Sequence, residues 1–551
     1  MYQMLRKLVW LLIFVQLFGM QVVTADDAQN SEAVRIELEQ LVHSGFLSNS
    51  GVHIASVDLL LNIYEPRNYL PAWNDQRQIG ELITAIQTTA AHGLDPSDYH
   101  FELVESIYTD RLAGRQASPE ETAVQDLILT DSLARLGYHQ LFGKVNPYTF
   151  DPHWNFRREL NDVDPAIAIQ NAIDSPSLMK FLRNFFPRGW FYRKLQTALA
   201  DYRQIAANGG WSSIPEGPTL KPGASDRRLP VVARRMIITG DLALRDNIDK
   251  LTVYDETLQQ AVRRFQGRHG LDTDAVIGPA TLRAFNVPVE KRVEQLEVNI
   301  ERARWVLDDI EDDFVLVNIA GFRAYVFRDR KVVWETKVQV GKPYYQSPVF
   351  RDEIKYLVFN PTWTVPYSIA TRDLLPKIKR DPDFFANRDF DLKDDKGKFI
   401  DPSSIDWATI TARNFRFWLV QRPGPNNALG RVKIIFPNKH AVYLHDTPSK
   451  ALFGKSARAF SSGCIRVENP FDLAEQLLGG DGWNQEKFQA VLDSKKTKTV
   501  LLSKPMPVLL LYWTAMVEPD GTVYFFNDVY ERDERIAKAL GEPFRLDMPG
   551  Q

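Results

Sequence analysis

Residues 314–340 read FVLVNIAGFRAYVFRDRKVVWETKVQV, and this stretch decides the fold of the C-terminal half of the chain. Two runs rich in Val, Phe and Tyr flank a turn at Gly321, and a third run of similar composition follows. Short runs of this kind, separated by Gly or Pro, predict β-strands. Further runs follow at 355–359, 415–421, 432–436 and 441–444. Together they predict a β-sandwich or a barrel-like domain.

A charged insert at residues 368–413 interrupts this β-rich region and carries Phe384, Phe385, Phe399 and Trp407. Long inserts inside a domain are often lids or binding loops, and a merely solvated loop is the alternative. After the insert, residues 508–540 alternate again and end in a predicted helix.

The N-terminal half has helical rather than strand periodicity. Apolar residues recur at helical spacing in 78–91, 122–141 and 190–208, and Gly and Pro break the pattern at 209–210 and 215–222. This region predicts a helical scaffold without a catalytic signature. With 551 residues, about three to five domains are expected, so the fold class is multidomain α+β.

The first residues have the pattern of a secretory signal peptide. Arg6 and Lys7 precede an apolar run at 8–18, and the small-residue pattern 23–25 precedes two Asp residues. We expect cleavage after Ala25, with an uncleaved anchor as the alternative. No later stretch resembles a membrane span, so the mature protein is expected to be soluble in an extracytoplasmic, oxidising space. The net charge of −3 argues against a nucleic-acid partner.

The chain has one cysteine, Cys464, in the sequence SSGCIR at 461–466, and His445 lies nineteen residues before it. A thiol with a pKa of about 8.5 is mostly protonated at neutral pH, so a nearby imidazole would have to take its proton. Gly463 permits close backbone approach, which predicts an oxyanion hole built from backbone N–H groups around Gly463 and Cys464. We expect the backbone carbonyl of Asp446 to orient His445.

Each of these residues also has a simpler interpretation. A lone cysteine is often a small buried apolar residue. Tyr443 shares the strand face of His445, so it either lines the pocket or only packs against neighbouring side chains. Arg466 either braces the loop or binds a substrate carboxylate. His440 and His445 would face opposite sides of a continuous strand and match no common zinc motif. We predict no metal and no cofactor.

Residues 254–286 form a small helical unit that resembles the peptidoglycan-binding domain. The matching pattern is Ala261-Val262 with Phe265-Gln266, followed by Gly270-Leu271 and Ile277-Gly278-Pro279. The departure is Ala275, where that family often has Gly.

The patterns HDTP at 445–448 and SSGCIR at 461–466 resemble the catalytic domain of the L,D-transpeptidases, which has the YkuD-type fold. Supporting matches run through 314–470, and with the preceding domains nearly the whole chain resembles the large multidomain periplasmic members. Many members have His where this chain has Ser462, so the histidine role falls on His445 alone. The resemblance assigns the nucleophile to Cys464 and the general base to His445. The expected substrate-binding residues are Trp363, Tyr443, Phe460, Ser461, Ser462 and Arg466.

The resemblance also implies a reaction. Cys464 would attack the carbonyl of the third residue, a diamino acid, of a tetrapeptide stem and release the terminal D-Ala. The amine of a second stem would resolve the thioester into a third-to-third-residue cross-link in the periplasm. The insert would be a capping loop, carbapenems would acylate the enzyme, and other cell-wall synthases are possible partners. The expected boundaries are signal peptide 1–25, scaffold 26–235, peptidoglycan-binding-like domain 236–288, connecting helix 289–311, catalytic domain 312–505 and C-terminal segment 506–551.

Two alternatives remain at this point. A cysteine peptidase or L,D-carboxypeptidase acting on cell-wall peptides would use water in place of the acceptor amine. The NlpC-type hydrolases, however, place Cys before His, the reverse of the order here. The other alternative is a cell-wall-binding scaffold whose β-domain has lost its activity.

Overall fold

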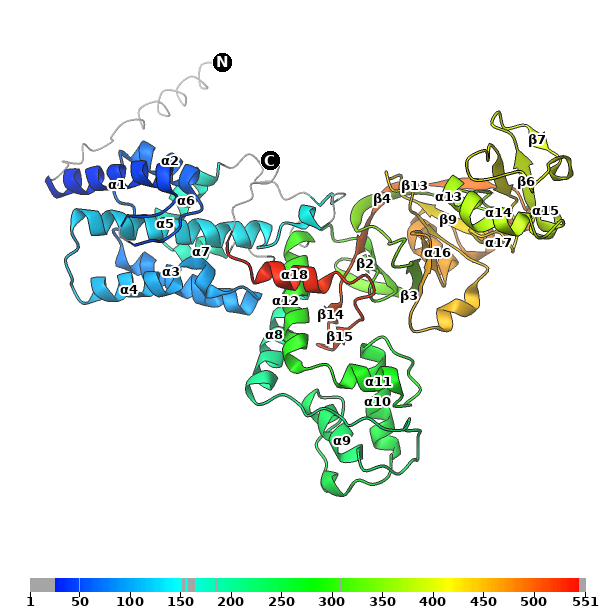
Figure 1. Ribbon diagram of the computed structural model, residues 1–551, viewed down its shortest axis with the longest axis horizontal. Helices are drawn as coiled ribbons and strands as arrows, with labels where there is room; N and C mark the ends of the chain where they lie inside the picture. Colours follow the sequence, from blue (N-terminus) through cyan, green and yellow to red (C-terminus); the bar gives the residue numbers. More distant parts are fainter. Residues whose placement is uncertain are drawn as a thin grey trace, which may run out of the picture.

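The computed structural model describes residues 25–48, 50–150, 154–156, 164–183, 187, 189–306 and 310–544. The predicted signal segment lies outside these residues except for Ala25, the first residue of helix α1. A helical lobe, a small helical module and a β-rich body surround a central helical junction (Figure 1). None of the helices in the described part of the chain combines the length and apolarity that a membrane span requires.

The N-terminal lobe is built around helix α5 (Pro119–Phe142), which begins at a capping box between Ser118 and Glu121 and is buried along most of its length. Its buried Asp126 accepts hydrogen bonds from the backbone N–H groups of Ala72 and Trp73, at 2.8 and 2.9 Å. This carboxylate therefore fixes the loop before α3, and the helical scaffold expected from the sequence is confirmed. The other helices are α1 (Ala25–Ser44), α2 (Val57–Tyr64), α3 (Gln76–Thr88), α4 (Phe101–Leu112), α6 (Pro165–Ile173) and α7 (Leu178–Leu182).

The central junction consists of helices α8 and α12 together with a short two-stranded sheet. Their apolar side chains form one shared core, separate from that of the N-terminal lobe. Helix α18 packs on α12 and brings the C-terminal segment to the junction (Figure 1). The elements are α8 (Trp190–Ala207), α12 (Val289–Val306), β14 (Ala515–Val517), β15 (Val523–Phe525) and α18 (Asp533–Leu540).

The small module contains α9 (Leu229–Ile238), α10 (Glu256–Arg268) and α11 (Pro279–Phe285). The predicted boundary between residues 235 and 236 is wrong, because it cuts through α9, whose Val232 and Met236 pack in the same core as Phe265 of α10. Ala275 has a φ of +62°, in the left-handed region that glycine adopts most easily. This explains why glycine suits the position.

The β-rich body is a sheet in the order β11-β3-β12-β10-β9-β4-β13-β1-β2. Because β2 also pairs with β3, the sheet closes on itself around an apolar interior, which confirms the barrel-like alternative. The strands are β1 (Phe314–Asn318), β2 (Arg323–Arg328), β3 (Lys331–Gly341), β4 (Phe350–Phe359), β9 (Val432–Ile435), β10 (Leu444–His445), β11 (Ala459–Ser461), β12 (Ile465–Val467) and β13 (Lys498–Leu511). Helices α16 (Pro470–Leu478) and α17 (Gln485–Asp493) cover part of the barrel.

Strand β13 overturns the predicted boundary between residues 505 and 506. It pairs with β4 and β1 in the sheet, so the barrel continues to residue 511.

The insert between β4 and β9 is a compact unit at the far end of the barrel (Figure 1). It forms its own sheet in the order β5-β8-β6-β7 and its own core around Phe384, so it is not a solvated loop. Its sheet begins and ends beyond the predicted limits of 368 and 413. The elements are β5 (Trp363–Thr364), α13 (Tyr367–Ile369), α14 (Leu375–Ile378), α15 (Phe384–Asn387), β6 (Phe390–Lys393), β7 (Phe399–Ile400) and β8 (Trp418–Gln421).

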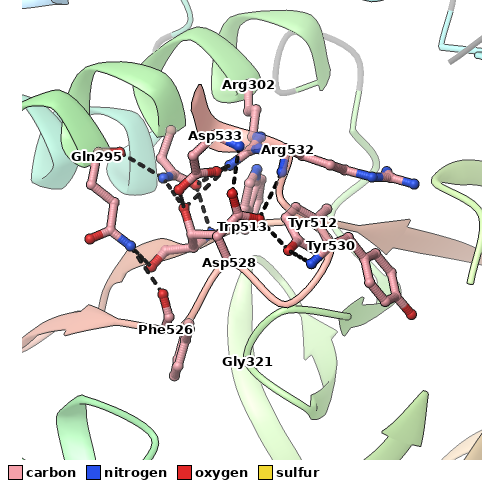
Figure 2. A network of polar contacts seen from close by, with 12 residues as sticks. Gln295, Arg302, Gly321, Tyr512, Trp513, Phe526, Asp528, Tyr530, Arg532 and Asp533 are labelled. Carbon is pink, nitrogen blue, oxygen red and sulfur yellow. Dashed lines mark hydrogen bonds and ion pairs between the residues drawn. The ribbon is translucent and has the colours of Figure 1, made fainter. Parts of the chain in front are cut away.

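A polar network ties the C-terminal segment to the junction and to the barrel (Figure 2). Arg302 of α12 forms an ion pair with Asp533 at 2.6 Å. The backbone N–H of Asp533 donates to Asp528, which also accepts from the hydroxyl of Tyr512 at the end of β13. The ring of Tyr512 stacks on that of Tyr530, with centroids 5.3 Å apart. The network thus fixes Tyr530 against the barrel.

Candidate functional site

The candidate site lies on the outer face of the barrel, where four strands bring polar side chains into one row. Lys433 of β9 pairs with His445 of β10, His445 pairs with Arg466 of β12, and Arg466 pairs with Gln339 of β3. Paired positions point to the same face of a sheet, whereas the residues between them point to the other face. The intervening Leu444 is accordingly buried in the barrel interior.

Cys464 joins this row one step along the sheet. It immediately precedes β12, and its neighbour on the adjacent strand segment is Tyr443, whose carbonyl accepts from the N–H of Ile465 at 3.1 Å. The Tyr443 ring meets the His445 ring edge-on at 5.6 Å, and its hydroxyl hydrogen-bonds to the Cys464 thiol. The sulfur lies 3.9 Å from the carbonyl oxygen of Ala441. Cys464, Tyr443 and His445 therefore form one cluster.

The turn that carries the thiol is held by two serines. Ser461 Oγ accepts from the N–H of Gly463 at 3.1 Å and donates to the carbonyl of Cys464 at 2.6 Å. Ser347 Oγ donates to the carbonyl of Gly463 at 2.7 Å. Gly463 has a φ of +115°, a backbone conformation that would be strained for a residue with a side chain.

The predicted oxyanion role of the Gly463 amide is wrong for this geometry, because that N–H already bonds to Ser461 Oγ. Among the described residues, the N–H of Cys464 donates to no other group. The Cys464 amide is therefore the backbone donor that is free to bind a developing oxyanion.

His445 is only 4% exposed, and its Nδ1 lies 2.5 Å from the carbonyl oxygen of Asp446, the orienting contact expected from the sequence. Nδ1 therefore carries the proton, and Nε2 is left as the proton acceptor. Burial, followed by the charges of Arg466 and Lys433, lowers the pKa of His445 to about 3, against the opposing effect of two backbone carbonyls. The imidazole is neutral at physiological pH and able to take a proton.

The Asp446 side chain holds this orienting carbonyl in place. Its carboxylate accepts from the backbone N–H of Arg431 at 2.9 Å and pairs with Lys450 at 2.6 Å. Gly430 has a φ of +61°, and a Cβ there would lie 2.4 Å from the Asp446 side chain. The 430–431 turn, Asp446 and His445 are therefore packed as one unit.

The thiol itself is not ionised in the free protein. Burial raises the pKa of Cys464, and the hydrogen bond from Tyr443 and the charges of Lys433 and Arg466 oppose this effect only partly. The site is thus a neutral thiol beside a neutral imidazole.

The sequence analysis missed three residues of this site, Lys433, Gln339 and Ser347. Lys433 is the one nearest to the histidine in strand register. Its ammonium lies 3.8 Å from the centroid of the Tyr443 ring, and burial lowers its pKa. Its position in the alternating run at 432–435 indicated an outward-facing residue, but only the strand register places it beside His445. Arg466 Nη1 donates to Gln339 at 3.3 Å, and its buried Nε has no hydrogen-bond partner among the described residues.

The remaining predicted substrate-binding residues lie in different parts of the fold. Ser462 is exposed at the turn, and Phe460 is half-buried in β11. Trp363 lies in β5 and packs with the core of the insert, its ring 6.2 Å from that of Phe390. No described contact joins Trp363 to Cys464 or His445, so its substrate role stays a prediction.

The two histidines that were weighed as a metal pair lie in different surroundings. His440 and His445 do not share a strand, because β10 begins only at Leu444 and Ala441 has a φ of +52°. His440 instead packs against the Phe350 ring at 5.0 Å. Across the part of the chain that the structure describes, no three His, Cys, Asp or Glu side chains are grouped to hold a metal ion.

Three family models match this chain. Residues 312–500 match the one described as the L,D-transpeptidase catalytic domain, and residues 241–285 match a putative peptidoglycan binding domain. Residues 58–199 match a model described as the scaffold domain. The chain therefore carries a YkuD-type L,D-transpeptidase catalytic domain behind a scaffold domain and a peptidoglycan-binding domain.

A putative L,D-transpeptidase of Haemophilus influenzae is 36% identical over 253 residues, which is 45% of this chain. The match spans 51% of that relative, about half of its length. A solved L,D-transpeptidase structure, residues 123–326 of the protein from Xylanimonas cellulosilytica, matches with 14% identity and a TM-score of 0.18. That match covers 54% of this chain and 99% of the solved chain.

Proposed function

We propose that this protein is a peptidoglycan L,D-transpeptidase that links stem peptides between their third residues through a Cys464 thioester. The observation that carries the proposal is the cluster of a neutral His445 and the single cysteine on one face of the barrel. The Nδ1 of His445 is held by the Asp446 carbonyl, and the Cys464 amide has no hydrogen-bond acceptor among the residues that the structure describes. The match of this region to the L,D-transpeptidase catalytic domain supports the same chemistry.

In the first step, His445 Nε2 takes the thiol proton while Cys464 Sγ bonds to the carbonyl carbon of the third residue of a tetrapeptide donor. The Cys464 N–H stabilises the oxyanion. The bond to the terminal D-Ala nitrogen then breaks, and the imidazolium returns the proton to that nitrogen. The products are free D-Ala and an acyl-enzyme thioester.

In the second step, the side-chain amine of the diamino acid of another stem attacks the thioester. Its nitrogen bonds to the carbonyl carbon, the C–S bond breaks, and His445 passes the amine proton to the departing sulfur. Water in place of the amine would give an L,D-carboxypeptidase. Cys464 is partly accessible at the surface, and the insert forms a separate core of its own beside the barrel.

The proposed substrate and the peptidoglycan-binding match support a periplasmic location for this reaction, at the cell wall. Carbapenems are expected to acylate the same thiol, and other cell-wall synthases are proposed partners.

The test is mass spectrometry of a disaccharide-tetrapeptide incubated with the protein from residue 26 onward. A dimer lighter than two monomers by one D-Ala, absent with Cys464→Ala, is the expected result. Loss of D-Ala without a dimer would replace transpeptidation by L,D-carboxypeptidation. An unchanged substrate, with a thiol inert to iodoacetamide, would favour the inactive cell-wall scaffold.

A further inference from the structure

Two cations flank the catalytic histidine in strand register, Lys433 on β9 and Arg466 on β12. In the described part of the chain, no carboxylate lies within ion-pair distance of either. Arg466 donates to a neutral partner, Gln339, and its buried Nε has no hydrogen-bond partner among the residues that the structure describes. A partly buried cation without a counter-ion is costly, so a pair of them indicates a place for an anion.

The two cations also act on the reacting groups. Both lower the pKa of His445, and both favour the Cys464 thiolate. An anion bound between them would weaken their effect on His445 and make the imidazole a stronger base. Binding of an anionic substrate would thus strengthen the base at the moment it is needed.

We propose that Lys433 and Arg466 form a carboxylate-binding site that recognises the free C-terminal carboxylate of the donor peptide. The inference rests on the proposed function. The scissile carbonyl in that reaction lies one residue before the C-terminus, so the terminal carboxylate is held close to Cys464. A planar guanidinium binds carboxylates through paired hydrogen bonds, and an ammonium adds a second charge-assisted contact. The site would select donors that end one residue after the diamino acid.

The diamino acid side chain is a second possible source of a carboxylate, and matched substrates separate the two. The free tetrapeptide is compared with one amidated at the terminal D-Ala and with one amidated at the diamino acid side chain. Removing a charge-assisted contact costs roughly tenfold or more in kcat/KM. We expect that loss of kcat/KM with the tetrapeptide amidated at the terminal D-Ala. In Lys433→Met we expect most of the difference between the free and the terminally amidated tetrapeptide to disappear.

A second measurement does not need the transpeptidase reaction. Iodoacetate and iodoacetamide alkylate a thiol in the same way but differ by a carboxylate, and Cys464 is the only cysteine in the chain. Because the thiolate fraction affects both reagents equally, the rate with iodoacetate divided by the rate with iodoacetamide reports anion recognition alone. We call this quotient the alkylation ratio. We expect this ratio to exceed that of the unfolded chain and to fall about tenfold in Lys433→Met.

Two further variants serve as controls. Lys433→Arg keeps the charge and is expected to keep most of the ratio, which separates recognition from misfolding. Lys496→Met removes an exposed charge elsewhere on the chain and is expected to change nothing.

The outcomes distinguish the two proposals. A lowered alkylation ratio in Lys433→Met without any cross-linking by the wild type would support the anion site and reject the transpeptidase. Cross-linking with an alkylation ratio that Lys433→Met leaves unchanged would overturn the carboxylate site alone. A loss of kcat/KM seen only with the tetrapeptide amidated at the diamino acid side chain would overturn the assignment to the C-terminal carboxylate.

Discussion

Tyr530 lies outside the catalytic cluster, yet we expect its hydroxyl to control how the catalytic turn is held. The hydroxyl donates to the carbonyl of Gly341 at 2.7 Å and accepts from the N–H of Ser347 at 3.1 Å. Ser347 Oγ in turn accepts from the Gly341 N–H at 3.0 Å and donates to the carbonyl of Gly463. One buried hydroxyl thus supports Ser347, which holds the peptide next to Cys464, the proposed nucleophile.

The expected magnitude follows from this geometry. Tyr530→Phe leaves a buried carbonyl and a buried N–H unpaired, and each unpaired group costs about 1–3 kcal/mol. We therefore expect the free energy of unfolding of the barrel to fall by about 2–6 kcal/mol. A displacement of the Cys464 amide by a fraction of an ångström should lower kcat on the order of tenfold, with KM little changed.

The assay compares kcat, KM and guanidinium unfolding for the wild type, Tyr530→Phe and Tyr254→Phe. Tyr254 is a matched control, because its buried hydroxyl donates to the carbonyl of Ala275 at 2.7 Å in the small module, away from the catalytic turn. We expect Tyr254→Phe to lose stability without losing kcat. Full activity in Tyr530→Phe would refute the reasoning.

A double-mutant cycle with Ser347→Ala tests whether the two residues act through one path. If they do, the effect of both substitutions on kcat is smaller than the sum of the single effects. Additive effects would mean that Tyr530 acts on the site by another route.

Two further predictions concern the base and its support. Because the pKa of His445 is about 3 when folded and about 6.5 when unfolded, stability is full above pH 6.5 and falls as the pH drops towards 3. Between pH 7 and pH 5 this histidine alone should remove about 2 kcal/mol, a loss absent from His445→Gln in matched guanidinium titrations. Gly430→Ala should lower kcat/KM, because its Cβ would displace Asp446 and with it the carbonyl that orients His445. Gly424→Ala, where a Cβ meets no atom within 4 Å, is the control, and equal activity in both variants would contradict the prediction.

The chemical groups of the site were predictable from local sequence. A single cysteine after a glycine, with a histidine upstream, indicates nucleophile and base without knowledge of the fold, and the Asp446 carbonyl follows from its position next to His445. The helical lobe and the strands β1 to β3 were predictable from periodicity for the same reason. In each case the signal lies within a few neighbouring residues.

The errors arose where distant segments decide the outcome. Helix α9 reads as the end of the scaffold but packs with α10, and β13 crosses a predicted boundary because it fills the gap between β4 and β1. The Gly463 amide seemed free until the structure placed Ser461 Oγ against it.

The role of Lys433 depends most strongly on distant parts of the chain. It reaches His445 only because the return from the insert pairs β9 with both β4 and β10. If β9 slipped by one residue against β10, the Lys433 side chain would point into the apolar interior of the barrel. An apolar side chain of β9 would then lie beside His445. The pairing register of β9 with β10 therefore determines which side chain of β9 lies beside His445. The buried residues that fix it, Ile434 and Leu444, affect the charge around His445 without touching the substrate.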